Sequence, residues 1–245
     1  MNQVVTKGAH VEKMAVTDTE MEKINRFAIE PLTAEDVFIF KVAVCDNEVD
    51  RDFEVFPRES LDKMAALFVG KTIIKDHSAQ ADHQVARIYS AEVADGHGTT
   101  KNGESYAQLV ASCYMVRTDG NKDLITEIQS GIKKEVSVGC SIKKAVCSIC
   151  GMDNRQGYCK HFHGREYDGQ LCYFKLEEPS DAYEVSFVAV PAQPAAGVIK
   201  SYTGEDFTEP EEKPETEKEG LIDTELGIVK SFLFLQKESE EFNHE

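Results

Sequence analysis

Two short segments of this sequence carry the residue types that nucleophilic acyl transfer needs. KDHSA, residues 75–79, contains His77, and KEVSVGCSI, residues 134–142, contains Ser137. A serine becomes a nucleophile when a base accepts its proton and a third group orients that base. His77 is the candidate base. The spacing alone also fits a surface histidine and an ordinary polar position on a strand, because such sites are defined by geometry.

A second group of residues has the types and spacing of a metal site. In CSICGMDNRQGYCKHFHGREYDGQLC, Cys147 and Cys150 form a C-x2-C pair, and Cys159 follows nine residues after the second. Thiolates at this spacing bind one Zn²⁺ in a tight turn, and either His161 or His163 completes a tetrahedron. The alternative interpretation is that these cysteines are reduced and simply pack.

The cysteine count favours metal binding over disulfides. Seven cysteines are an odd number for a disulfide framework, and four of them lie close together between residues 147 and 172. Cys172 could take the place of the imidazole. Three thiolates and one imidazole leave no open coordination position, so we expect a structural zinc with no part in catalysis.

Charge and length limit the possible functions. The 245 residues suit one main domain with appendages, and the formal charge of −17 argues against a nucleic-acid partner. Residues 205–245 hold fourteen acidic and four basic side chains, a net of −10. The first fourteen residues have no apolar core of the signal-peptide kind, and no stretch of about eighteen apolar residues occurs. We therefore expect an intracellular protein with protein partners and no membrane contact.

The candidate residues must be positioned by strands and two helices. Runs of β-branched and aromatic residues predict strands, and apolar residues at helical spacing predict helices. The alternation within residues 135–146 puts Ser137, Gly139 and Ser141 on the face opposite Val136 and its apolar neighbours. Cys140 lies on the apolar face and is interpreted as core packing. The predicted strands are 37–45, 73–74, 85–93, 106–116, 135–146 and 183–190, and the predicted helices are 57–68 and 121–130.

Composition changes along the chain divide it into segments. Residues 1–34 lack a convincing apolar face and are predicted to be a weakly structured N-terminal arm. Residues 35–202 form the main domain, with an insert at 146–172. The acidic, proline-bearing stretch 203–220 is predicted to be a linker. An apolar stripe in 221–245 predicts an amphipathic segment that docks on its own domain or on a partner.

The order of these motifs resembles a known family. KDHSA, ITEIQSGIKKEVSVGCSI and YEVSFVAVPAQPAA occur in the order seen in the prohead proteases of tailed bacteriophages, which are related in fold to herpesvirus assemblin. The similarity covers about residues 36–200. It implies an α+β fold, with a mainly antiparallel, barrel-like, assemblin-type body, a few helices and a small zinc-knuckle insert.

The resemblance also implies roles for individual residues. His77 would be the general base, Ser137 the nucleophile and Glu184 the group that orients the imidazole. Similar inserts in phage relatives, of the form C-x2-C…C-x-H-x2-G, imply His161 as the fourth metal ligand beside the cysteines. The implied metal set is Cys147, Cys150, Cys159 and His161.

Alternatives remain for the orienting group and for the oxyanion donors. Asp181 lies close to Glu184 in sequence, and assemblins use a second histidine in this role. Asp76 is a poorer candidate because adjacent side chains on an extended segment point to opposite faces, and His83 is a distant one. Gly139 permits a close backbone approach to an oxyanion, and its other interpretation is a β-bulge.

The activity implied by the resemblance is a serine endopeptidase. It would cleave segments of the major capsid protein or a scaffold protein, and itself, during procapsid maturation in the host cytoplasm. Oligomers are compatible with such a role. The alternatives are a catalytically inactive structural or scaffold protein of the capsid and a zinc-dependent nucleic-acid-binding module, which the acidity disfavours.

Overall fold

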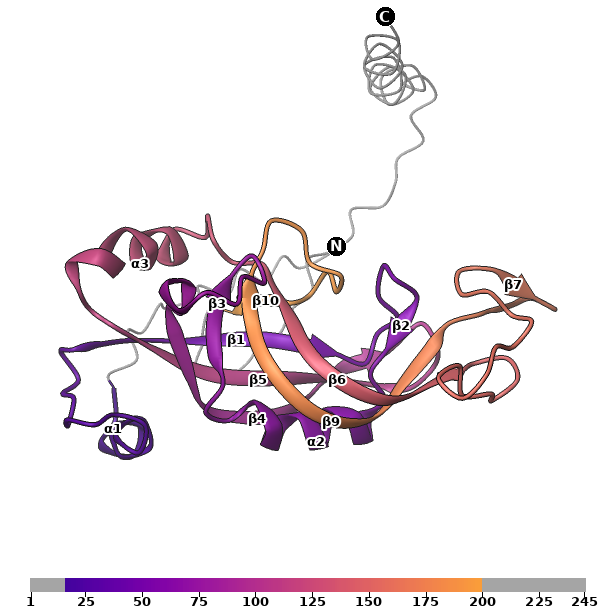
Figure 1. Ribbon diagram of the computed structural model, residues 1–245, viewed down its shortest axis with the longest axis horizontal. Helices are drawn as coiled ribbons and strands as arrows, with labels where there is room; N and C mark the ends of the chain where they lie inside the picture. Colours follow the sequence, from indigo (N-terminus) through magenta and orange to yellow (C-terminus); the bar gives the residue numbers. More distant parts are fainter. Residues whose placement is uncertain (1–15, 200–245) are drawn as a thin grey trace, which may run out of the picture. The chain divides into compact units, whose positions relative to one another are not determined.

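Residues 16–199 are described in the computed structural model, and they form a mixed α+β body made mostly of strands (Figure 1). The expected linker 203–220 and amphipathic segment 221–245 lie outside the described residues, as do residues 1–15 of the expected arm. Within the described part, the predicted strands and helices are all present, with shifts at their ends. The α+β class is therefore confirmed.

One sheet contains nearly all the strands. Its order is β10-β1-β5-β4-β3-β9-β2, and β6 pairs with β9 off this path. Most neighbours are antiparallel, while β3 and β2 run parallel to β9. An isolated bridge between Glu135 and Gly197 connects the start of β6 to β10, but the described strands form no closed barrel, so the barrel-like form is not confirmed. The strands are β1 (Val37–Asp46), β2 (Glu54–Val55), β3 (Thr72–Lys75), β4 (Ala86–Thr99), β5 (Ser105–Val116), β6 (Val136–Cys147), β9 (Phe174–Phe187) and β10 (Gly197–Ile199).

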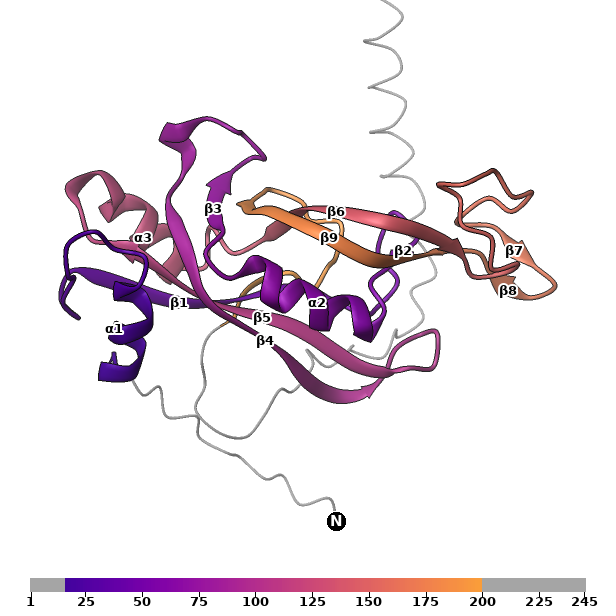
Figure 2. The same cartoon turned by 60° about the horizontal axis from the view of Figure 1, so that its bottom comes forward.

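Helix α2 covers the sheet on its apolar face. Its residues Leu61, Met64 and Phe68 recur at helical spacing and are fully buried. Figure 2 shows α2 lying lengthwise along the sheet, close to β9 and β5. The remaining elements are α1 (Asp18–Asn25), α2 (Arg58–Phe68), α3 (Lys122–Gln129), two 3₁₀ turns (Ala81–His83 and Asp119–Asn121) and the small hairpin of β7 (Glu166–Tyr167) and β8 (Gln170–Leu171).

The prediction of a weakly structured arm was wrong for residues 18–25, which form α1. Thr17 and Glu20 make a capping box, in which each side chain accepts a hydrogen bond from the other's backbone N–H. Ile24 is buried in a cluster with Tyr89 and Tyr114, and the Tyr89 hydroxyl donates to Glu20. Burial against the sheet stabilises a helix that has little apolar periodicity of its own.

Strand β9 is longer than the sequence pattern indicated. It begins at Phe174, nine residues before the predicted start at residue 183. Its first half carries polar residues and Pro179, which would ordinarily interrupt a ladder. Here Glu178 takes a positive φ of 55° and the register with β6 shifts at this point, so Pro179 occupies an irregularity that tolerates it.

Candidate active site and metal centre

Three adjacent strands, β3, β9 and β6, position the candidate catalytic residues. In the antiparallel ladder of β6 and β9, Ser137 lies opposite Ser186, and Gly139 lies opposite Glu184. Residues directly opposite one another project to the same side of a sheet, as do residues two apart on one strand. All four therefore share the face opposite the core-facing Val136, which confirms the predicted orientation of Ser137.

His77 approaches this face from the far side of β9. The chain leaves β3 and turns through two consecutive residues with positive φ, 52° at Asp76 and 51° at His77. The turn brings His77 Nδ1 to 2.8 Å from Glu184 Oε1. The His77 side chain is 46 % exposed and that of Glu184 is 13 % exposed, so a half-exposed imidazole contacts a largely buried carboxylate. The structure thus brings together two of the three candidate catalytic residues.

The second carboxylate oxygen of Glu184 has a partner of its own. The Ser186 hydroxyl donates to Glu184 Oε2 over 2.6 Å and accepts the backbone N–H of His77 over 3.0 Å. Sequence reasoning missed Ser186, although the spacing of Glu184 and Ser186 on a strand already put them on one face. A Cβ atom at Gly139 would lie 2.4 Å from Glu184 Oε1, so glycine leaves the carboxylate its space. The ladder skips Tyr183 next to Gly139, consistent with the β-bulge interpretation.

Ser137 lies on the shared face but is not bonded to His77. Within residues 16–199 its hydroxyl forms no hydrogen bond, and it lines a cavity of about 310 Å³ that Gln193 also borders. Glu54 and Asp50 lie at the same cavity with Arg155. Burial, followed by repulsion from Asp50 and Asp52, raises the pKa of Glu54.

The alternative residues Asp181, His83 and Cys140 form no hydrogen bond to His77 or Ser137 in the described part of the chain. Asp181 accepts from Lys71 Nζ over 3.1 Å and has no bond to His77. The Nδ1 atom of His83 is buried without a partner in the described part of the chain. Cys140 packs against the core, and burial is the main cause that raises the pKa of its thiol to about 11. A thiol so poorly ionised near neutrality is a weak nucleophile, and the interpretation of Cys140 as core packing is confirmed.

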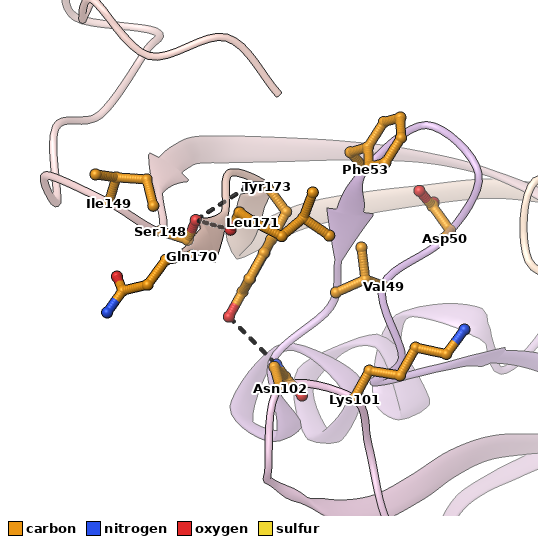
Figure 3. Close-up of a pocket in the computed structure, with 10 residues that line it drawn as sticks. All are labelled: Val49, Asp50, Phe53, Lys101, Asn102, Ser148, Ile149, Gln170, Leu171 and Tyr173. Atoms are coloured by element: carbon orange, nitrogen blue, oxygen red, sulfur yellow. Dashed lines mark hydrogen bonds between the residues drawn. The ribbon is translucent and has the colours of Figure 1, made fainter. Parts of the chain in front are cut away.

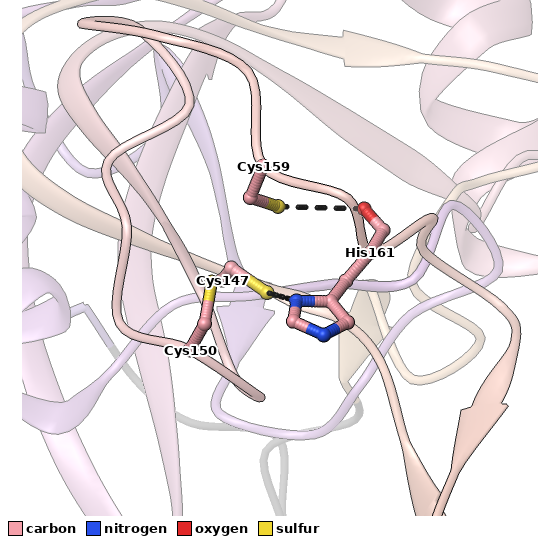
Figure 4. A group of neighbouring side chains, drawn as sticks. All are labelled: Cys147, Cys150, Cys159 and His161. Atoms are coloured by element: carbon pink, nitrogen blue, oxygen red, sulfur yellow. Dashed lines mark hydrogen bonds between the residues drawn. The ribbon is translucent and has the colours of Figure 1, made fainter.

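The cysteine-rich insert gathers four candidate metal ligands (Figure 4). One ligand atom from each of Cys147, Cys150, Cys159 and His161 lies within 4.8 Å of all the others, and this group could bind a metal such as zinc. A tetrahedral site with Zn–S distances of about 2.3 Å needs ligand atoms roughly 3.8 Å apart. Cys147 Sγ and His161 Nδ1 are separated by 3.8 Å. The donor set and its spacing fit zinc.

The ionisation of Cys147 suits metal binding. Burial tends to raise the pKa of its thiol, but hydrogen bonds from the backbone of Cys150 and Ile149 outweigh it and hold the pKa below its ordinary value. The thiolate is the form that binds metals. The Sγ atom of Cys172 is 3.9 Å from that of Cys147, which places a fourth sulfur beside the three of the group.

The structure separates the two candidate histidine ligands. His161 belongs to the metal-binding group, with the ring of Tyr167 packed edge-on at 4.6 Å between centroids. His163 instead lies between aromatic rings, 6.4 Å from Phe53 and 5.4 Å from Phe174. His161 is thus the histidine that is placed to complete a tetrahedron.

Removing one thiolate is expected to remove the metal. We expect one zinc per chain in the purified protein and substantially less in Cys147→Ser, with a melting midpoint lower by roughly 5–10 °C, because metal bound only to the folded state stabilises it by about 3 kcal/mol. Metal analysis and calorimetry measure both quantities. Cys140→Ser is the matched control. His161→Ala should lose zinc and His163→Ala should keep it, and zinc retained by Cys147→Ser would contradict the site.

A separate pocket of about 450 Å³ lies between the insert and the loops of the sheet (Figure 3). The Tyr173 hydroxyl accepts from Asn102 Nδ2 across 3.5 Å, and Ser148 Oγ donates to Leu171 and accepts from the Tyr173 backbone. None of the candidate catalytic residues borders it. Its lining residues are Val49, Asp50, Phe53, Lys101, Asn102, Ser148, Ile149, Gln170, Leu171 and Tyr173.

Comparisons with family models, with curated proteins and with solved structures found no match to this chain. Within residues 16–199, none of the helices is both long enough and apolar enough to span a bilayer. What the protein does must therefore be inferred from its own residues and contacts.

Proposed function

We propose that the protein is a serine endopeptidase of the prohead-protease type, with Ser137 as nucleophile, His77 as general base and Glu184 as the orienting carboxylate. The observation that carries the proposal is the 2.8 Å contact between His77 Nδ1 and Glu184 Oε1, which joins residues 107 positions apart. The motif order around these residues is the second support. A carboxylate bonded to one ring nitrogen leaves the other free to act as a base.

The proposed mechanism follows from this tautomer. With Nδ1–H donating a hydrogen bond to Glu184, Nε2 takes the proton of Ser137 while Oγ attacks a peptide carbonyl. The protonated imidazole then delivers that proton to the leaving amine, and an acyl-enzyme forms on Ser137. Water, deprotonated by His77, releases the acid product and regenerates the serine. Glu184 stabilises the imidazolium at each proton transfer.

Ser137 suits the nucleophile's role better than the other serine of the site. Ser186 is 0 % exposed and its hydroxyl already donates to Glu184, so no substrate carbonyl can reach it. Ser137 is half-buried, borders a cavity and has a hydroxyl with no bond within the described residues. Hydrogen bonds between nucleophile and base often tighten only when substrate binds.

The substrates we propose are scaffold-protein and major-capsid-protein segments, and the enzyme itself, cleaved inside an assembling procapsid in the host cytoplasm. The resemblance supports these substrates, together with an assemblin-type body and a zinc knuckle whose metal is structural. A net charge of −17 disfavours a nucleic-acid partner. Four ligands from the insert would leave no position for a reacting water, so the metal would stiffen the insert.

Co-expression with a major capsid protein and a scaffold protein of a tailed bacteriophage tests the proposal. Mass spectrometry of the products should reveal new termini in the capsid protein, a scaffold segment or the enzyme, and these should be absent when the peptidase is omitted. A set of termini identical in both samples would favour the alternative, a structural or scaffold protein that keeps the fold without the chemistry.

A further inference from the structure

Ser186 is bonded to both members of the His77–Glu184 pair. It lies in β9, has no exposed surface and has one hydroxyl with two strong partners. The hydroxyl accepts the backbone N–H of His77 over 3.0 Å and donates to Glu184 Oε2 over 2.6 Å. One side chain thus connects the base's backbone to the carboxylate that orients its ring.

The backbone at His77 needs such support. Non-glycine residues with positive φ are uncommon, and two in succession, Asp76 and His77, make a conformation that the surrounding contacts must hold. Two backbone N–H groups of this turn donate hydrogen bonds to β9, in addition to the side-chain contact between His77 and Glu184. The Asp76 N–H donates to the Phe187 carbonyl over 3.0 Å, and the His77 N–H donates to Ser186. Of the two, only the second depends on a side chain.

The carboxylate of Glu184 is also held at both oxygens. Oε1 contacts His77 Nδ1, and Oε2 accepts from Ser186. With a partner on each oxygen, rotation of the carboxylate breaks at least one bond. Gly139, across the ladder, has no side chain that could hold the carboxylate in place instead. Without the Ser186 hydroxyl, nothing within the described residues would bond Oε2.

We propose that Ser186 is a positioning residue, which fixes the imidazole of His77 through the His77 backbone and through Glu184 without touching substrate. The kinetic part of this inference rests on the proposed peptidase function. The structural part does not, because the two hydrogen bonds can be measured in a protein with no known substrate.

The test compares Ser186→Ala with Ser60→Ala. Ser60 is also buried and also donates a 2.8 Å bond, to the Leu176 carbonyl, so the control loses a similar bond away from His77. Ser186→Ala should speed amide hydrogen exchange at His77 by about tenfold or more and lower kcat by about 10- to 100-fold with KM changed by about twofold at most. Ser60→Ala should change neither. Rates are compared at a temperature where all variants are fully folded.

The outcomes separate this inference from the proposed function. Wild-type exchange at His77 in Ser186→Ala overturns the positioning role, as does wild-type kcat in a protein that cleaves peptides. If exchange at His77 is faster in Ser186→Ala but the wild-type protein cleaves no peptide, the positioning role is supported and the proposed peptidase function is wrong. If Ser186→Ala and Ser60→Ala lose kcat equally, the loss comes from removing any buried hydrogen bond. Ser186 would then contribute only to stability, and the inference would be wrong.

Discussion

Replacing Ser137 with alanine is expected to lower kcat by about 10⁴-fold or more, because no acyl-enzyme can form without the hydroxyl. The change removes one oxygen that has no hydrogen bond within residues 16–199, so the fold and the melting midpoint should be unaffected. The measurement is the rate at which new termini appear in a co-expressed capsid or scaffold protein, read by mass spectrometry.

Ser141→Ala is the matched control for this prediction. Ser141 lies on the same strand, on the same face as Ser137, and opposite Asp181 in the ladder. Ser141→Ala should retain full activity, since Ser141 lies two residues beyond Gly139 and four residues beyond the nucleophile on the same strand. If processing by Ser137→Ala equals that by Ser141→Ala, Ser137 is not the nucleophile and the peptidase mechanism is wrong.

The strands around the site could be predicted because their residues alternate or cluster strongly. In β6 the alternation of apolar and small polar residues fixed which face Ser137 occupies. Helix α2 was equally predictable from Leu61, Met64 and Phe68. In both elements, the local pattern and the tertiary burial indicate the same structure.

Other features depend on contacts between distant residues and could not be predicted so well. Helix α1 is stabilised by packing of Ile24 on the sheet, which its own composition does not reveal, although the Thr17–Glu20 capping box was a readable signal. The early start of β9 depends on pairing with β6 around Pro179. The pairing of His77 with Glu184 came from family resemblance, since no local pattern specifies a contact between loops and strands so far apart.

In the metal site, too, one part could be predicted from local spacing and another part depends on distant contacts. The C-x2-C spacing identified Cys147 and Cys150, because a tight turn brings two thiolates together by local geometry. The choice between His161 and His163 is made by packing: the ring of His163 stacks on Phe53, which lies far away in sequence. Spacing alone could not have excluded either histidine.

Glu184→Gln tests the orienting carboxylate and should lower kcat by about 10³- to 10⁴-fold with little effect on folding, since the two side chains have the same shape. The physical reason is twofold. The amide carries no charge to stabilise the imidazolium. If its nitrogen faces His77, it also forces the tautomer in which Nε2 holds the proton and cannot act as a base.

Asp181→Asn is the control that separates the two acidic candidates. Asp181 forms an ion pair with Lys71 whose side chains are both partly exposed, and such pairs contribute about 1 kcal/mol or less. The variant should therefore cleave within about twofold of the wild-type rate. Loss of cleavage in Asp181→Asn with retention in Glu184→Gln would assign the orienting role to Asp181. The 2.8 Å contact between His77 and Glu184 favours the opposite result, because a carboxylate must touch the ring in order to fix its tautomer.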